Sequence, residues 1–381
     1  MNIVISIDSF KGSLSSMQAA DAIAAGARAA IPDSRIAICP LADGGEGTVD
    51  ALVAALGAEY GKAIVSDPLG RPIEAAFALT PDGKTAIIEM SAAAGITLVE
   101  PCERDPRIAS TYGVGELILA AIARGARHFL VGIGGSATND AGIGMLAALG
   151  FKFLDQQGAE IDPRGPIAAG RVAKILADGV KKEVLESTFS VACDVKNPLC
   201  GENGCSAVYG PQKGADAAAV AEMDAALSHF AAVTAAQFAG ADPDTAGAGA
   251  AGGLGFAFLA FLGGKLLPGA ELVTKECGLE ELVRDADVVV TGEGKIDFQS
   301  AMGKAPAAVA ALAKTYGKHV IAFCGAIDQK GENASCPGID AIFPIPTGAH
   351  TLAEAMDIDI ASRNLRITAE QVFRVIALYQ A

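Results

Sequence analysis

The 381-residue sequence contains no tryptophan and only four histidines, and aromatic residues make up 5% of it. The histidines are scattered along the chain at His128, His229, His319 and His350. None stands beside an acidic or nucleophilic motif at a spacing typical of histidine-based catalysis. The sequence therefore gives no support to a histidine-activated nucleophile or to a histidine-rich metal site.

Paired cysteines are also missing. The chain has eight cysteines but no C-x-x-C pair, and the closest spacing joins Cys200 to Cys205. In a chain of this size the pattern favours reduced thiols over a disulfide framework or a zinc site. The first strand, residues 2–8, directly follows the initial Met without a basic or cleavable apolar segment. We therefore expect a cytoplasmic protein.

Positive charge is scarce, with 29 Lys and Arg against 44 Asp and Glu and a formal net charge of −15. This balance argues against nucleic acid or an anionic membrane as a partner, but a local basic patch could still bind a small anionic substrate. One uncharged stretch, residues 247–264, approaches the length of a membrane span. Its first half is almost wholly Gly and Ala, which is too weakly apolar to insert well.

Strands and helices alternate at both ends of the sequence. Near the N-terminus, a strand at 2–8 precedes a helix at 15–30, where Ser15 and Gln18 form an S-x-x-Q capping box. Near the C-terminus, DADVVVTGEG at 285–294 is a strand entering a glycine-rich loop. This alternation predicts a parallel sheet whose loops gather at the carboxyl ends of the strands.

The middle of the chain differs, because residues 73–90 have the pattern of a β-hairpin. We therefore predict an α/β protein built from two domains. A Rossmann-like, doubly wound parallel-sheet domain (residues 1–64 and 284–381) is interrupted by a second, mixed α/β domain (residues 65–283). The active site is expected in the cleft between them.

One motif suggests a dinucleotide site. Gly132, Gly134 and Ala137 of GIGGSA fit G-x-G-x-x-[GA] after a strand, and Asp155 follows at about the distance of a ribose-binding acid. However, Asp140 falls at the start of the next helix, where a pyrophosphate should lie, and its charge would repel that group. An NAD-dependent oxidoreductase stays an alternative, as does a non-catalytic protein that binds a hydroxy acid.

Polar residues recur in the loops that follow the strands. They are Asp8, Ser9, Lys11, Ser13, Asp43, Glu46, Ser136, Thr138, Asn139, Asp140, Asp194, Asn197, Gln212, Lys213, Glu293, Asp297 and Lys304. Carboxylates, a few lysines and many backbone amides, without histidine, suit phosphoryl transfer, in which positioning, Mg²⁺ and cationic groups do most of the work.

Seven segments in register carry a resemblance to a known family. They are SIDSFKGSLSS, PLADGGEGT, GGSATNDAGIGMLAALG, ACDVKNPLCG, YGPQKGA, GAAGGLG and TGEGKIDFQSAMGKAP. Together they resemble the type I glycerate kinase family, except that this chain has Ile7 where the family usually has proline. The resemblance implies a kinase that uses ATP and Mg²⁺ to phosphorylate D-glycerate, usually to 2-phosphoglycerate. Its expected partners are therefore small molecules, D-glycerate and ATP.

The same loops supply candidates for the catalytic and substrate-binding roles. We expect Asp194 to act as the general base on the attacking hydroxyl, and Lys11 to offset the charge of the substrate carboxylate or the transferred phosphoryl group. The glycines of LADGGEG would bring Asp43 and Glu46 toward glycerate's hydroxyls or a Mg²⁺-bound water. The expected substrate-binding set is Ser9, Lys11, Asp43, Gly44, Gly45, Glu46, Ser136, Asn139 and Asp140.

A second set is expected to bind the nucleotide and its metal ion. GAAGGLG at 249–255 carries no acid, so it is the better phosphate cradle of the glycine-rich loops. The predicted ATP-binding residues are Gly252, Gly253, Gly255, Gly292, Glu293, Gly294, Lys213 and Lys304. The predicted Mg²⁺ ligands are Glu293 and Asp297.

Overall fold

The computed structural model describes residues 1–41, 48–296, 305–327, 337–349 and 351–379. It divides into two compact units, unit 1 (residues 1–56 and 270–381) and unit 2 (residues 57–269). The sequence-based boundaries lie at 64/65 and 283/284. Strand β3 (Glu59–Ser66) pairs along its whole length with β4 (Pro72–Leu79), which accounts for the position of residues 59–64 in unit 2.

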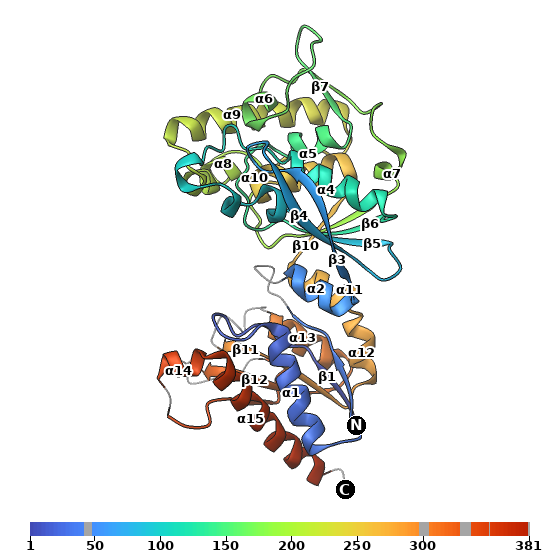
Figure 1. Cartoon of the computed structure of the whole chain (residues 1–381), viewed down its shortest axis with the longest axis vertical. Coiled ribbons are helices and arrows are strands. Elements are labelled where there is room, and N and C mark those ends of the chain that lie inside the picture. The colour runs from blue at the N-terminus through green and yellow to red at the C-terminus, as the bar shows by residue number, and fades with distance from the viewer. Residues whose placement is uncertain (42–47, 297–304, 328–336, 350, 380–381) are drawn as a thin grey trace. The chain divides into compact units, whose positions relative to one another are not determined.

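Unit 1 is built on a five-stranded parallel sheet in the order β13-β12-β11-β1-β2 (Figure 1). Counted along the chain within this unit, the strand order is 2-1-3-4-5, the flavodoxin-like variant of the doubly wound fold. The predicted doubly wound parallel sheet is therefore confirmed, and its topological switch point lies between β1 and β11. The strands are β1 (Asn2–Ile5), β2 (Arg35–Ile38), β11 (Val288–Ile296), β12 (His319–Ile327) and β13 (Ala341–Pro344).

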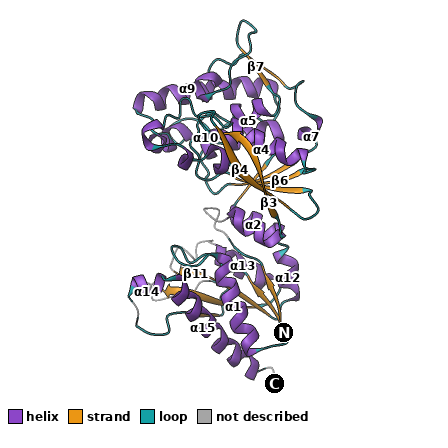
Figure 2. Ribbon diagram, in the orientation of Figure 1, coloured by secondary structure: helices purple, strands orange, loops and turns teal. Residues whose placement is uncertain are grey.

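Helices cover both faces of this sheet (Figure 2). Because side chains alternate along a strand, Ile3 and Ile5 of β1 pack into one apolar cluster while Val4 packs into another. The first cluster contains α1 (Ser16–Ala30) and α15 (Ile358–Leu378), and the second contains α12 (Leu279–Asp285) and α13 (Ala305–Thr315). The capping box predicted for α1 is confirmed by the Gln18 N–H donating to Ser15 Oγ at 3.2 Å. The remaining helices of this part are α2 (Thr48–Leu56), α11 (Gly269–Glu276) and α14 (Leu352–Met356).

Unit 2 contains a mixed six-stranded sheet in the order β10-β9-β6-β5-β4-β3, with antiparallel pairing only at β3–β4 and β4–β5 among these strands, all of which the structure describes. The hairpin predicted at 73–90 is confirmed as β4 and β5, closed by the Gly83 N–H donating to Thr80 O. The other strands are β5 (Thr85–Glu89), β6 (His128–Gly132), β9 (Thr188–Ala192) and β10 (Lys265–Leu267), and β7 (Lys152–Leu154) pairs separately with β8 (Lys174–Leu176).

The alanine-rich segment at 217–237 of unit 2 forms the long helix α9 (Ala217–Gln237). Asp216 caps its first turn by accepting the Ala219 N–H at 2.8 Å. The remaining helices are α3 (Ser91–Ala94), α4 (Tyr112–Ala123), α5 (Ile143–Ala148), α6 (Gly165–Ala169), α7 (Lys182–Leu185), α8 (Cys205–Tyr209) and α10 (Ala250–Leu262). In the part of the chain that the structure describes, no helix combines the length and apolar character that crossing a bilayer requires.

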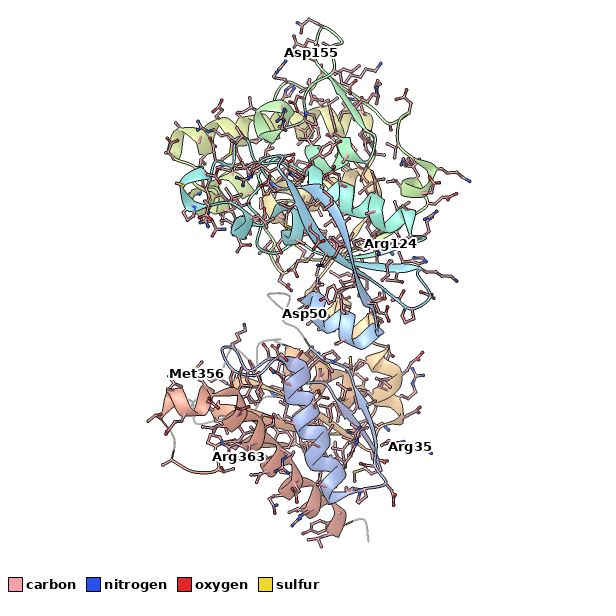
Figure 3. All side chains as sticks on the ribbon, in the orientation of Figure 1. Arg35, Asp50, Arg124, Asp155, Met356 and Arg363 are labelled. Carbon is pink, nitrogen blue, oxygen red and sulfur yellow. The ribbon has the colours of Figure 1, made fainter. Side chains whose placement is uncertain are left out.

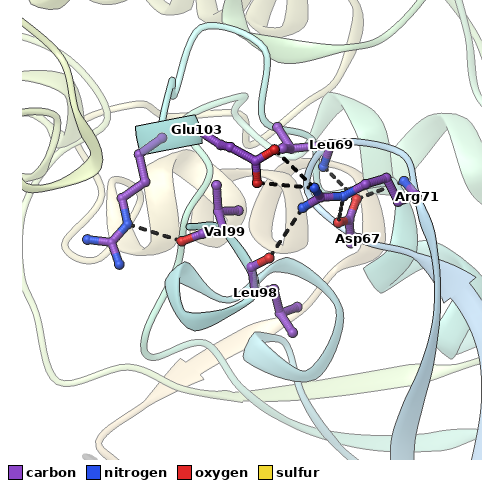
Figure 4. A network of polar contacts seen from close by, with 7 residues as sticks. Asp67, Leu69, Arg71, Leu98, Val99 and Glu103 are labelled. Atoms are coloured by element: carbon purple, nitrogen blue, oxygen red, sulfur yellow. Dashed lines mark hydrogen bonds and ion pairs between the residues drawn. The ribbon is translucent and has the colours of Figure 1, made fainter. Parts of the chain in front are cut away.

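A polar network fastens the β3–β4 turn to the segment that leads into α4 (Figure 4). Buried Asp67 accepts hydrogen bonds from the backbone N–H groups of Leu69 and Arg71 and from the Arg71 guanidinium, at 2.6–2.8 Å. Arg71 also pairs with Glu103 at 3.1 Å and donates to Leu98 O. The network therefore steadies the chain just ahead of Thr111, a residue that contacts the loop described below.

Candidate functional site

The predicted site residues that the structure describes fall into two groups, one in each unit. In unit 1 they lie at the carboxyl ends of β1 and β11. In unit 2 they lie in the β6–α5 loop (residues 133–142), just after β9, at Lys213 between α8 and α9, and on α10. A site between the units stays a prediction, and each group is described within its own unit.

The unit 1 group lines a pocket of about 360 Å³. We call it the switch-point pocket, because the loop after β1 and the end of β11 both line it. In doubly wound sheets, ligands bind at the carboxyl ends of the strands where the strand order reverses. Its polar lining includes Asp8, Ser9 and Lys11 after β1, and Glu293, Gly294 and Lys295 on β11.

Two carboxylates come together at this switch point. The parallel ladder continues beyond β1, since the N–H groups of Ser6 and Asp8 donate to Val290 O and Gly292 O at 2.8 and 2.9 Å. This register places Asp8 beside Glu293 on the neighbouring strand. Asp8 is 6% exposed and Glu293 8%. Two adjacent oxygen donors at a pocket wall suit a hard divalent cation that is also held by a phosphate ligand.

The glycines of the TGEG motif allow three backbones to meet beneath the pocket. A Cβ on Gly292 would lie 1.9 Å from Phe323 O of β12, and a Cβ on Gly294 would lie 3.2 Å from Phe10 Cα. Side chains at these positions would therefore push β11 away from β12 and from the loop after β1. The predicted nucleotide-binding segment 292–294 is thus a close-packed floor, with Gly294 reaching the pocket.

Two exposed lysines, Lys11 and Lys295, bring positive charge to the pocket. Lys11 is among the residues predicted from the sequence, whereas Lys295 is not. The signal for Lys295 was its position directly after the glycine-rich GEG segment. A pair of lysines at a pocket of this size provides the local cationic patch that an acidic protein needs to bind an anion.

In unit 2, a buried lysine holds the β6–α5 loop. Lys213 is 3% exposed, and its Nζ donates to Ser136 Oγ at 3.0 Å and to Thr138 O at 2.6 Å. Burial disfavours the ammonium form and lowers the pKa of Lys213 to about 8. The sequence predicts a phosphate contact for this lysine. In the structure two of its hydrogen bonds go to the loop, and the phosphate contact stays a prediction.

Asp140 is fully buried at the end of the same loop. Its carboxylate accepts hydrogen bonds from the N–H and Oγ1 of Thr111, both at 2.9 Å, and from the N–H groups of Gly142 and Gly144 at 3.0 and 3.3 Å. Burial raises its pKa despite these bonds. The carboxylate occupies the amides at the start of α5, where a dinucleotide's pyrophosphate would have to bind.

The other predicted substrate contacts of this loop are also directed inward. Ser136 Oγ donates to Thr138 O at 3.1 Å, and Asn139 Nδ2 donates to Ser206 Oγ at 2.8 Å. Ser136 is 8% exposed and Asn139 is fully buried, whereas the backbone at Gly134 and Gly135 is exposed. These contacts give the side chains a role in shaping the loop, and their contact with substrate stays a prediction.

The glycines of GAAGGLG have a packing explanation. Gly252 and Gly253 adopt left-handed backbone angles (φ 67° and 91°), and a Cβ on Gly252 would lie 2.1 Å from Thr138 O. The Ala141 N–H donates to Gly252 O at 2.9 Å. A Cβ on Gly255 would likewise lie 2.2 Å from the Gly247 carbonyl oxygen. This backbone, predicted as a phosphate cradle, is buried against the β6–α5 loop or its own turn.

Asp194, the predicted base, is exposed and lies two residues after the end of β9. Its Oδ1 accepts the Gly269 N–H at 3.1 Å. Strands β6 and β9 are parallel neighbours, with Gly132 opposite Ala192, so Asp194 and the β6–α5 loop leave the sheet at the same edge. The structure therefore brings these two predicted elements together.

Six predicted residues lie outside the described part of the chain: Asp43, Gly44, Gly45, Glu46, Asp297 and Lys304. Among the described residues, no group of three or more His, Cys, Asp and Glu side chains is arranged to hold a metal ion. The seven cysteines that the structure describes are free thiols. A resident metal centre therefore has no support in this part of the chain.

Comparison with known proteins fits this geometry. The model of the glycerate kinase family matches residues 3–377. A protein named glycerate kinase from Haemophilus influenzae is 46% identical over 378 residues, which span 99% of each chain. The chain belongs to the glycerate kinase family. A protein named glycerate 2-kinase from Escherichia coli strain K12 is 45% identical, with 97% of this chain and 98% of the relative covered.

The fold agrees with this glycerate kinase assignment. A crystal structure described as glycerate kinase 2 from Salmonella typhimurium LT2 superposes with a TM-score of 0.88 and 43% identity, covering 100% of this chain and 99% of that one. The resemblance noted in the sequence is thereby confirmed, and the chain is an enzyme, a phosphotransferase of the glycerate kinase type. The NAD-dependent and non-catalytic alternatives find no support in these relatives.

Proposed function

We propose that this enzyme transfers the γ-phosphoryl group of ATP to the 2-hydroxyl of D-glycerate, giving 2-phosphoglycerate and ADP. The observation that carries the proposal is the switch-point pocket, with two lysines and two carboxylates, in a chain of the glycerate kinase family. The name of the Escherichia coli relative, glycerate 2-kinase, supports the 2-position. The free cysteines of the described residues suit the reducing cytoplasm in which we place the enzyme.

The donor set at the pocket suits Mg²⁺ bound together with the nucleotide. Mg²⁺ usually takes one or two carboxylates and completes its shell with phosphate oxygens and water. Asp8 and Glu293 would hold it, joined by Asp297, which the sequence predicts as a ligand. When bound, Mg²⁺ neutralises charge on the phosphoryl groups.

Different residues of the enzyme then carry out different parts of the reaction. Asp194 accepts the proton of the 2-hydroxyl as its oxygen bonds to the γ-phosphorus and the bond from that phosphorus to the β,γ-bridging oxygen breaks. Lys11 offsets the negative charge of the transferred group. The Lys213–Ser136–Thr138 contacts and the buried carboxylate of Asp140 keep the β6–α5 loop in one conformation beside Asp194.

The test is the formation of ADP with each component omitted in turn. We expect turnover only when ATP, Mg²⁺ and D-glycerate are all present. Asp194→Asn keeps the shape of the side chain but removes the base, so kcat should fall by about 10²–10⁴ while ATP affinity changes little. Asp178→Asn makes the same change at an exposed site after β8 and is the matched control. Turnover without glycerate, or wild-type kcat in Asp194→Asn, would contradict the proposal.

A further inference from the structure

One wall of the switch-point pocket is apolar and is not needed by glycerate. Phe10, Ile345, Leu352 and Met356 line it, from the loop after β1, the segment after β13 and α14. Leu352 is 76% exposed and Met356 38%, so apolar surface on this wall faces solvent. D-glycerate carries a carboxylate and two hydroxyls on three carbons and has no apolar face to place there. The wall suits a flat, partly apolar ring system.

The wall and the cationic part of the pocket are in direct contact. A Cβ on Gly12 would lie 2.6 Å from Met356 Cε, so α14 packs on the turn that also carries Lys11. Met356 is labelled in Figure 3. The turn that carries Lys11 therefore borders the apolar wall at Met356. The pocket volume of about 360 Å³ falls within the range of small-molecule sites, about 300–1,000 Å³.

A buried amide gives the pocket a specific hydrogen-bond donor. Asn364 lines the pocket at 3% exposure, and it is the only polar residue among those that α15, described over its whole length, buries. Its Oδ1 accepts the Thr347 hydroxyl at 2.9 Å. This bond occupies the carbonyl side of the amide and fixes its orientation, so Nδ2 is the group available to a ligand acceptor.

We propose that the switch-point pocket binds the nucleoside of the phosphoryl donor. The base lies on the wall formed by Leu352, Met356 and Ile345, and Asn364 Nδ2 donates a hydrogen bond to an acceptor of the nucleoside. The phosphates then extend toward Lys11 and Lys295. This assignment rests on the proposed kinase function and adds α14 and α15 to the site.

The first experiment compares two ligands on the full-length enzyme, ADP and inorganic triphosphate, which lacks the nucleoside. Asn364→Ala should weaken ADP binding about tenfold, the scale of one hydrogen bond, and leave triphosphate affinity within about twofold. Arg363→Ala, exposed on the same turn of α15, is the control and should bind both ligands as the wild type does. An equal loss for both ligands in Asn364→Ala would overturn the assignment.

A second pair of variants avoids any change to the core. Leu352→Asp places a charge on the apolar wall, and Leu378→Asp makes the same change on α15 outside the pocket. Both leucines are 76% exposed, so neither substitution removes buried packing. We expect Leu352→Asp to weaken ADP binding about tenfold or more, and Leu378→Asp to leave it unchanged. Equal ADP affinity in the two variants would contradict the nucleoside site.

The outcomes separate this inference from the proposed function. If the wild type phosphorylates glycerate but neither Asn364→Ala nor Leu352→Asp affects ADP binding, the nucleoside lies elsewhere and the kinase function stands. If ADP binds with the predicted dependence on both residues but glycerate is not phosphorylated, the pocket assignment stands and the proposed function is wrong. A wild-type enzyme that does not bind ADP overturns the pocket assignment.

Discussion

At the scale of single residues, the β6–α5 loop depends on ionisable groups that the fold keeps out of water. Lys213 faces Asp140 and Cys205, and burial raises the pKa of Asp140 and takes that of Cys205 to about 12. A buried ammonium is costly unless its donors are satisfied, and here Ser136 Oγ and Thr138 O accept two of them. Burial of the Lys213 ammonium therefore lowers the stability of the folded protein, while its hydrogen bonds hold the β6–α5 loop in place.

This cost makes stability depend on pH. The folded-state pKa of Lys213, about 8, lies below the ordinary value of 10.5, so between these pH values the unfolded chain holds a proton that the folded chain has released. The contribution of this group to stability therefore rises with pH through that window, by roughly 3 kcal/mol. Lys213→Met should remove this rise, measured by urea unfolding at pH 7.5 and 10.

The control for Lys213→Met is Lys174→Met, an exposed lysine on β8 that should keep the wild-type profile. Above pH 9, Cys205 makes stability fall as the pH rises, because its folded-state pKa is raised. This fall occurs in all three proteins, so it cancels when their pH profiles are compared. If the unfolding free energy of Lys213→Met rose between pH 7.5 and 10 as much as that of the wild type, the buried ammonium would not be the source of the rise.

The sequence could not predict which way each polar side chain points. It correctly indicated that polar residues gather after the strands, because turns and helix starts select them. It could not distinguish Asn139 and Asp140, which bond within unit 2, from Lys295, which faces a pocket. That difference depends on tertiary contacts such as the one from Thr111, which lies 29 residues from Asp140.

At the scale of elements, periodicity predicted the strands and helices that alternate at both ends and the hairpin between them. The segment after β13 went unassigned, although Thr351 and Glu354 form a capping box and Asp357 caps α15. The apolar stripe of α15 packs against α1, where a Cβ on Gly26 would lie 2.4 Å from Arg366 O. The part of the switch-point pocket lined by α14 and α15, which includes Leu352, Met356 and Asn364, was therefore missed.

One glycine in α10 and the glycine that follows its last residue provide a test at this scale. Gly252 and Gly263 have similar left-handed angles, φ 67° and 60°, but only Gly252 has another atom close to its missing Cβ, Thr138 O at 2.1 Å. Gly263→Ala should cost about 1 kcal/mol of unfolding free energy from backbone strain alone. Gly252→Ala should cost about 2–4 kcal/mol, because the β6–α5 loop must also move. Equal losses in urea unfolding would contradict the packing role.

At the scale of the whole molecule, the chain is strongly acidic. With a net charge of −15, binding an anionic nucleotide and an anionic acid requires cations at the site itself. We propose that Lys11 and Lys295 supply them at the switch point, where the 2-1-3-4-5 strand order creates a place for ligands. The fold class could be predicted because alternating strands and helices allow few other arrangements.

The central claim is phosphoryl transfer to the 2-hydroxyl of D-glycerate, and phosphorus NMR of the reaction mixture tests it most directly. The enzyme is incubated with ATP, Mg²⁺ and D-glycerate, and the product signal is compared with added 2-phosphoglycerate and 3-phosphoglycerate. We predict a new phosphomonoester resonance that coincides with 2-phosphoglycerate and grows as ADP appears. A resonance that coincides with 3-phosphoglycerate, or no phosphomonoester besides free phosphate, would contradict the account.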